Sequence, residues 1–82
     1  MTQLLCGSYV RYNFDSSWVQ PPGRYTVGGR RVHRDGYSLY DGDRVLVLSE
    51  PAYHHDEVTF IALMKDGNAR WTTWQLNEIG DP

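Results

Sequence analysis

The sequence predicts an all-β fold, built as one small antiparallel domain over residues 1–82. Segments with strand-like alternation recur about every ten residues, separated by glycine, proline or Asp-Gly breaks, which is typical of a small barrel or sandwich. No window keeps apolar residues at the i, i+3, i+4, i+7 spacing of an amphipathic helix. We therefore expect about five to seven short strands, with an extra β-hairpin inserted near the N-terminus.

The N-terminal half predicts one strand, a loop and the inserted hairpin. Residues 8–14, SYVRYNF, alternate so that Val10, Tyr12 and Phe14 share an apolar face. DSSWVQPPGR follows as a loop, because Pro-Pro-Gly cannot pair in a central strand. RYTV and RRVH flank two glycines, which readily adopt the positive φ angles of a tight hairpin turn. The short strand YSLY then lies between two Asp-Gly turns.

The C-terminal half predicts three strands and a short ending. Residues 44–48 form a strand that Pro51 terminates, and AYHHDE is expected to be a polar loop. EVTFIALMK is the longest strand, and Asp-Gly-Asn turns the chain into the strand ARWTTW. The close, WQLNEI, predicts a 3₁₀ turn from about Trp74 and a last short strand.

The longest predicted strand is apolar on both faces. Its period of two places Phe60, Ala62 and Met64 on one face, and Ile61 and Leu63 on the other. A small barrel has a single interior, so the second set must be covered either by the N-terminal hairpin or by another chain. Ile61 and Leu63 are therefore the expected oligomer-interface residues of a possible homodimer.

The order of these features resembles an SH3-like small β-barrel of the KOW or Tudor kind. The resemblance covers Asp41–Ile79 and rests on GDRVLVL after a turn, a polar loop, a long strand, an Asp-Gly turn, an aromatic-bearing strand and the LNEI ending. It implies a fold and not one function, since such barrels bind peptides, methylated side chains, RNA or ribosomal partners, or serve as accessory subunits. A Tudor-like aromatic cage would draw on Tyr53, Trp71 and Trp74.

Charge is unevenly distributed along the chain. Residues 1–34 carry five arginines against one aspartate, a net charge of +4, while residues 35–82 carry three basic against nine acidic residues, a net charge of −6. The hairpin run GGRRVHRDG holds Arg30, Arg31 and Arg34. These arginines could pair with carboxylates of a protein partner or a second copy, remain solvated, or contact nucleic-acid phosphates. The acidic remainder argues against a general nucleic-acid binder.

No motif predicts catalysis, a metal site or a cofactor. In HHDE, His54–Glu57, neighbouring side chains of an extended loop point to opposite sides, and structural zinc sites use separated ligand pairs. Asp41–Asp43 lacks the further ligands of a calcium loop, and VGGRR lacks the lysine and the helix of a phosphate loop. A metal-dependent enzyme using His33, His54 and His55 is the least favoured alternative.

The single cysteine and the N-terminal segment indicate the cellular compartment of the protein. Cys6 is expected to be a small buried residue that opens the first strand, and one cysteine suits a reducing compartment. The N-terminus lacks the charged and apolar regions of a secretory signal, and no apolar run is long enough to span a bilayer. We expect a soluble, cytoplasmic protein without membrane contact.

These features predict a non-enzymatic protein–protein interaction module, such as a small phage or bacterial accessory protein that docks on a larger complex. Arginine and aromatic side chains are the usual energetic centres of such interfaces. The expected partner-binding residues are Arg30, Arg31, Arg34, Tyr37, Trp71 and Trp74. A nucleic-acid-binding small β-barrel is the alternative. The sequence leaves open whether Trp18 is an exposed anchor or a lid over one end of the barrel.

Overall fold

The computed structural model describes residues 4–14, 26–27 and 29–80, and these residues form an all-β fold. The one helical element among them is a 3₁₀ turn, η1 (Leu76–Glu78). None of the helical structure in this part of the chain has the length or apolar character needed to cross a bilayer. The strands are β1 (Tyr9–Tyr12), β2 (Thr26–Val27), β3 (Arg30–Val32), β4 (Ser38–Tyr40), β5 (Arg44–Val47), β6 (Ala52–His54), β7 (Glu57–Leu63), β8 (Ala69–Gln75) and β9 (Ile79–Gly80).

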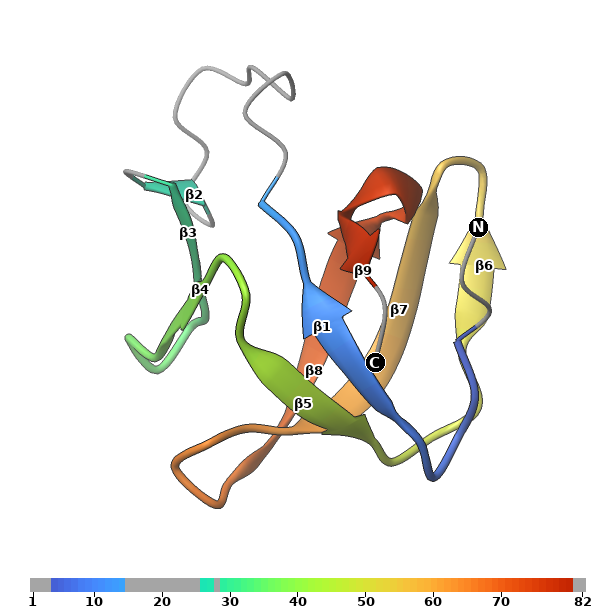
Figure 1. Ribbon diagram of the computed structural model, residues 1–82, viewed down its shortest axis with the longest axis horizontal. Helices are drawn as coiled ribbons and strands as arrows, with labels where there is room; N and C mark the ends of the chain where they lie inside the picture. The colour runs from blue at the N-terminus through green and yellow to red at the C-terminus, as the bar shows by residue number, and fades with distance from the viewer. Residues whose placement is uncertain (1–3, 15–25, 28, 81–82) are drawn as a thin grey trace.

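The strands form two antiparallel sheets (Figure 1). The larger sheet has the order β6-β7-β5-β1-β9, and β8 pairs with β7. The smaller one, the hairpin sheet, has the order β2-β3-β4. No ladder among the described residues joins β8 to β9, so the all-β prediction is confirmed whereas complete closure into a barrel is not.

The core follows the alternation that the sequence predicts. Along β7 buried and half-buried residues alternate, with Phe60, Ala62 and Met64 inside. On β1 the side chains of Val10 and Tyr12 are buried. The buried apolar side chains are Leu4, Val10, Tyr12, Leu39, Val45, Val47, Val58, Phe60, Ala62, Met64 and Trp74. Burial of each large side chain contributes roughly 1.5–3 kcal/mol, so this single cluster is the main stabilising element of a small domain.

Trp74 forms the centre of the core. It is fully buried, and its ring centroid lies 5.0 Å from that of Tyr12 and 5.1 Å from that of Phe60. The indole N–H donates a hydrogen bond of 2.9 Å to the Thr72 hydroxyl, which satisfies its polar atom inside the fold. The sequence predicted Trp74 as a surface anchor for a partner, whereas the structure places it inside the core.

A buried ionic cluster joins three distant segments. Glu78, in η1, is fully buried and accepts hydrogen bonds from the Tyr12 hydroxyl at 2.7 Å and from the Gln75 backbone N–H at 2.8 Å. Arg31 of β3, also buried, forms an ion pair with the same carboxylate. Burial and the hydrogen bond to Glu78 raise the pKa of Tyr12. Arg31 therefore connects the hairpin sheet to the core and does not face solvent.

Three local predictions differ from the structure. Residues 52–54, expected to be loop, form the edge strand β6, whose side chains are all exposed. Cys6 is exposed in a turn before β1 and is not a buried strand residue. The 3₁₀ turn begins at Leu76, because residues 69–75 continue as strand against β7. Trp18 and the loop DSSWVQPPGR lie outside the described residues.

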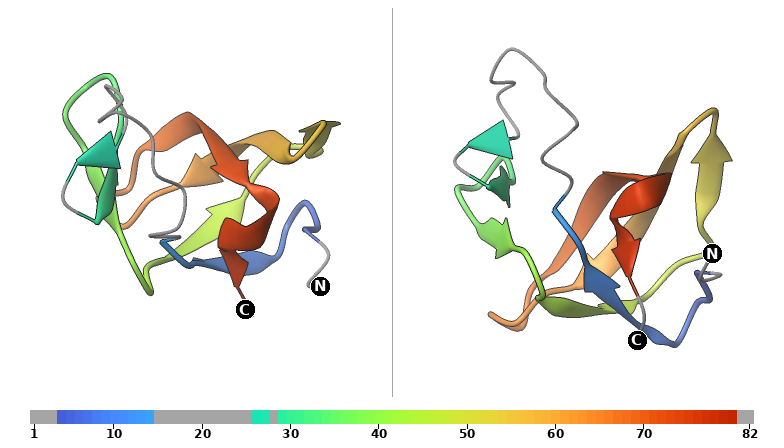
Figure 2. Two further views of the ribbon diagram at one scale, coloured as in Figure 1. Left: turned by 90° about the horizontal axis from the view of Figure 1, so that it is seen from above. Right: turned by 45° about the horizontal axis from the view of Figure 1, so that its top comes forward.

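The hairpin sheet forms as the sequence predicts. Thr26 pairs with Arg31 and Val27 with Arg30, and Gly29 adopts a φ of 81°, which favours glycine in the turn. In all three views the hairpin sheet lies on the side of β8 that is remote from β6 (Figures 1 and 2). The candidate site lies between the hairpin sheet and β8.

Candidate functional site

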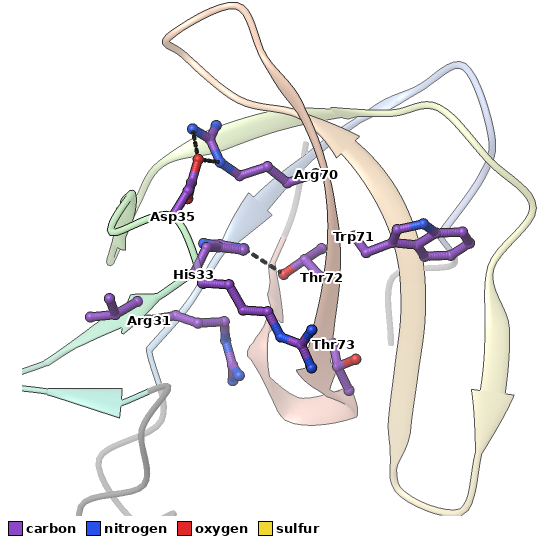
Figure 3. A pocket seen from close by; sticks show the side chains of 9 residues that line it. Arg31, His33, Asp35, Arg70, Trp71, Thr72 and Thr73 are labelled. Carbon is purple, nitrogen blue, oxygen red and sulfur yellow. Dashed lines mark hydrogen bonds and ion pairs between the residues drawn. The ribbon is translucent and has the colours of Figure 1, made fainter.

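A groove of about 600 Å³ separates β8 from the hairpin sheet (Figure 3). One wall consists of residues 31–35, from β3 and the turn after it. The other wall consists of residues 70–73 of β8. The groove therefore combines an arginine-bearing turn with the edge of a long strand.

The wall formed by β8 presents backbone groups that no described strand pairs. The hydrogen bonds from Met64 N to Asn68 O and from Leu76 N to Asp56 O fix the phase of the β7–β8 ladder. In an antiparallel ladder of this phase every second residue bonds to its partner strand, so the N–H and C=O groups of Trp71 and Thr73 point away from β7. Among the described residues β8 has no partner strand other than β7. The groove is thus bordered by a free strand edge.

His33 connects the two walls of the groove. The His33 Nε2 atom lies 3.2 Å from the Thr72 hydroxyl, and its Nδ1 atom lies 3.4 Å from the Tyr37 carbonyl. Because the Thr72 oxygen already accepts from Trp74, its own proton is available to His33. A neutral ring that carries its proton on Nδ1 then satisfies all these groups. Burial lowers the pKa of His33, with the neighbouring Arg70 and Arg31 charges acting in the same direction.

The state of His33 predicts a pH dependence of stability. A pKa below the ordinary value near 6.5 means that the unfolded chain binds more protons than the folded one as the pH falls through that value, so acid destabilises the fold. We expect a lower melting temperature at about pH 5.5 than at about pH 7.5, and a smaller difference for His33→Gln. His54→Gln and His55→Gln are matched controls that should keep the difference. Equal pH dependence in His33→Gln and the unmodified chain would contradict this prediction.

The arginines of the groove differ in whether carboxylates neutralise them. The Arg70 guanidinium lies between Asp35, at 2.6 Å, and Asp66, at 2.7 Å, and 4.2 Å from the centroid of the Tyr37 ring. These contacts raise the pKa of Arg70 and lower those of both carboxyls. Arg34 is exposed and forms no ion pair or hydrogen bond with any residue that the structure describes. Arg34 is therefore the cation in the groove that is available to an external carboxylate.

The six predicted partner-binding residues are distributed between surface and interior. Arg34 and Trp71 are exposed, and 66% of Trp71 is accessible to solvent. Tyr37 is half-buried beneath Arg70, and Arg30 is half-buried beside Tyr40. Arg31 and Trp74 are buried. The structure thus brings Arg34 and Trp71 to the same groove and assigns Arg31 and Trp74 to the interior.

The aromatic and histidine clusters considered from the sequence do not assemble into sites. Trp71 lies opposite Ile61, on the face away from the core, whereas Tyr53 and Trp74 both lie opposite Val58. The three aromatic residues therefore do not converge on one cage. The His54 and His55 rings pack on each other, with centroids 4.6 Å apart. Within the described ranges no three His, Cys, Asp or Glu residues are grouped so that they could hold a metal ion.

The acidic turn that resembled part of a calcium loop has a structural role. The Asp41 carboxylate accepts a hydrogen bond from the Phe14 backbone N–H at 2.8 Å. The Asp43 carboxylate accepts from the Tyr40 N–H at 3.0 Å and pairs with Lys65 at 2.9 Å. Both side chains therefore stabilise the connection between β4 and β5.

Comparisons of the chain with protein-family models, with curated proteins and with solved structures find no match. The geometry of the groove is therefore the basis for assigning a function.

Proposed function

We propose that this chain is a non-enzymatic protein-interaction module that binds an extended segment of a partner protein along the free edge of β8. The observation that carries this proposal is the outward direction of the Trp71 and Thr73 backbone groups, at the border of the groove. An added strand would pair with these groups, as in other cases of β-strand addition. The backbone would supply affinity, and side-chain contacts would supply specificity.

The charge of the groove indicates the chemistry of that segment. Arg34 has no carboxylate partner among the described residues, whereas Arg70 is neutralised by Asp35 and Asp66. A carboxylate of the bound segment opposite Arg34 would form a charge-assisted, bidentate hydrogen bond. The preferred ligand is therefore an extended peptide with at least one acidic residue.

Nucleic acid binding is less well supported by the same groove. Arg31 is paired with Glu78, and Arg70 with two aspartates, so these cations are not available for phosphates. With one free arginine at the groove, the logarithm of the affinity for a single strand would fall with a slope near −0.7 against the logarithm of the salt concentration. Such a weak dependence does not support tight binding at physiological salt.

A library of displayed random peptides, followed by titration of the selected peptides, tests this proposal. We expect selection of peptides that carry acidic residues, and binding to weaken about tenfold or more in Arg34→Glu. The matched control is Arg11→Glu, which reverses an exposed arginine of β1 outside the groove and should leave binding unchanged.

A second pair of variants separates strand addition from simple charge attraction. Thr73→Pro removes an N–H that faces the groove and takes no part in the β7–β8 ladder, so it should weaken peptide binding while the fold persists. Arg34→Glu and Thr73→Pro proteins that bind peptides as well as the unmodified chain would refute the proposal. Stronger binding of short single-stranded DNA or RNA than of peptides at about 50 mM salt would favour the nucleic-acid alternative.

The cellular role that we infer is that of a small accessory protein, of phage or bacterial origin, which docks on a larger complex. A compact domain with a groove beside a free strand edge supports such a role. A cytoplasmic location is also inferred, since Cys6 is an exposed free thiol and such thiols persist in reducing compartments.

A further inference from the structure

The outer face of the larger sheet carries a continuous apolar patch. We define the outer face as the side of β5, β7 and β8 that points away from the core. Leu46 lies opposite Leu63, and Ile61 lies opposite Trp71. Leu48 adjoins Ile61, to whose carbonyl its N–H donates at 2.7 Å, and 42% of Leu48 is exposed. These five side chains form two adjacent apolar rows across three strands.

The described hairpin does not cover this patch. Its contacts with the rest of the fold include the Arg31–Glu78 and Asp35–Arg70 ion pairs and the His33–Thr72 hydrogen bond, all on the core side of the sheet. Figure 3 shows the Trp71 ring directed away from His33 and the rest of the groove. Ile61 and Leu63 remain only half-buried. The sequence left open whether the N-terminal hairpin or another chain covers Ile61 and Leu63. The described part of the hairpin does not cover them.

Opposite charges occupy the two ends of the outer face. Arg44 lies beyond the Leu46–Leu63 row, where Lys65 is already paired with Asp43, and Glu57 begins β7 at the other end, opposite His54. Glu57 and Lys65 are eight positions apart, a distance of about 26 Å along an extended chain. Ile61 lies midway between them. Neither Arg44 nor Glu57 forms an ion pair with another described residue.

We infer that the outer face is an interface between two copies of this chain, related by a two-fold axis along the Leu48–Ile61–Trp71 row. A rotation about that axis places this row against itself and reverses the strand direction. The basic end of each copy then meets the acidic end of the other. A two-fold axis along the strands would instead place like charges together. The order of Arg44, the apolar rows and Glu57 is therefore self-complementary and favours a second copy as the occupant.

This interface is separate from the peptide groove. The groove uses the backbone groups of Trp71 and Thr73 at the edge of β8, whereas the dimer uses the outer face of β5, β7 and β8. Burial of the apolar rows stabilises the dimer, and the charged ends fix its orientation. The dimer does not depend on the proposed function, and the two can fail independently.

Light scattering and sedimentation across a range of protein concentrations test the dimer. We expect a mass of twice 9.5 kDa that falls to that of the monomer on dilution. Leu48→Ser should weaken dimerisation about tenfold or more, because it removes a central apolar contact. Tyr40→Ser, an exposed aromatic of the hairpin sheet, is the matched control and should leave the mass unchanged. A monomer at every concentration, or a dimer that Leu48→Ser leaves unaffected, would overturn the inference.

Charge reversal tests the orientation of the two copies. Arg44→Glu and Glu57→Arg should each weaken the dimer, because each opposes like charges across the interface. The double variant Arg44→Glu/Glu57→Arg restores opposite charges between copies and should recover dimerisation. An equimolar mixture of the two single variants should also form dimers. Single reversals without effect on dimerisation would overturn the two-fold arrangement, and circular dichroism would confirm that each variant folds.

Discussion

The Glu78→Ala variant is expected to lose about 3–5 kcal/mol of stability, a large part of what a small domain possesses. The substitution leaves the Arg31 guanidinium buried beside the Tyr12 ring without its carboxylate, and it removes acceptors for the Tyr12 hydroxyl and the Gln75 N–H. For a domain of this size the corresponding fall in melting temperature is roughly 10–40 °C. Urea unfolding followed by tryptophan fluorescence measures the change.

Two further variants show whether the ionic cluster is the cause. Glu78→Gln keeps hydrogen-bonding capacity but removes the charge, so it should destabilise less than Glu78→Ala. Arg31→Met/Glu78→Leu replaces the ion pair by apolar side chains. It should recover much of the stability that Glu78→Ala loses, because an apolar pair leaves no buried charge. An unfolding midpoint in Glu78→Ala close to that of the unmodified chain would show that the carboxylate has no structural importance. Because Arg31 belongs to this cluster, Arg34 is the residue to substitute in binding experiments.

The Trp74→Ala variant is expected to lose about 3–5 kcal/mol, whereas Trp71→Ala should change stability by less than about 0.5 kcal/mol. Both residues lie on β8, but Trp74 is fully buried against Tyr12 and Phe60 while 66% of Trp71 is exposed. The same chemical change therefore produces a cavity at one position and only a smaller surface at the other. Thermal unfolding by circular dichroism measures both.

The comparison between the two tryptophans also separates folding from binding. Trp71→Ala should fold normally and weaken self-association, because the Trp71 ring lies on the outer face and is directed away from the groove (Figure 3). Similar losses of stability in the two variants would mean that Trp71 is packed inside the fold. A neutral Trp74→Ala would mean that the core is centred elsewhere.

Period-two patterning explains why most of the fold could be predicted. In β1 apolar residues alternate with exposed ones, in β7 the period of two predicts which of its apolar residues face the core, and glycine marks the tight turn of the hairpin. The strand β6 was predicted as loop, since it is an edge strand whose three side chains are all exposed and show no alternation. Closure of the sheet depends on non-local pairing, which local patterns do not encode.

The candidate site could be predicted only in part. The sequence singled out Arg34 and Trp71, because an arginine run and aromatic residues are recognisable without a fold, but it did not distinguish the exposed Trp71 from the buried Trp74. Arg31 was assigned to a partner, since its carboxylate, Glu78, lies 47 residues away along the chain and only the fold brings the two together. The free edge of β8 was not predicted, because pairing on one side only is a property of the sheet.

The Arg31–Glu78 pair also bears on how a ligand would enter the groove. If the hairpin wall swung away from β8, the Glu78 carboxylate would remain in a low-dielectric interior without its ion pair to Arg31. The wall is therefore held in position before any ligand arrives. For the proposed peptide ligand, such preorganisation would reduce the entropy cost of binding, because no flexible loop would have to be ordered.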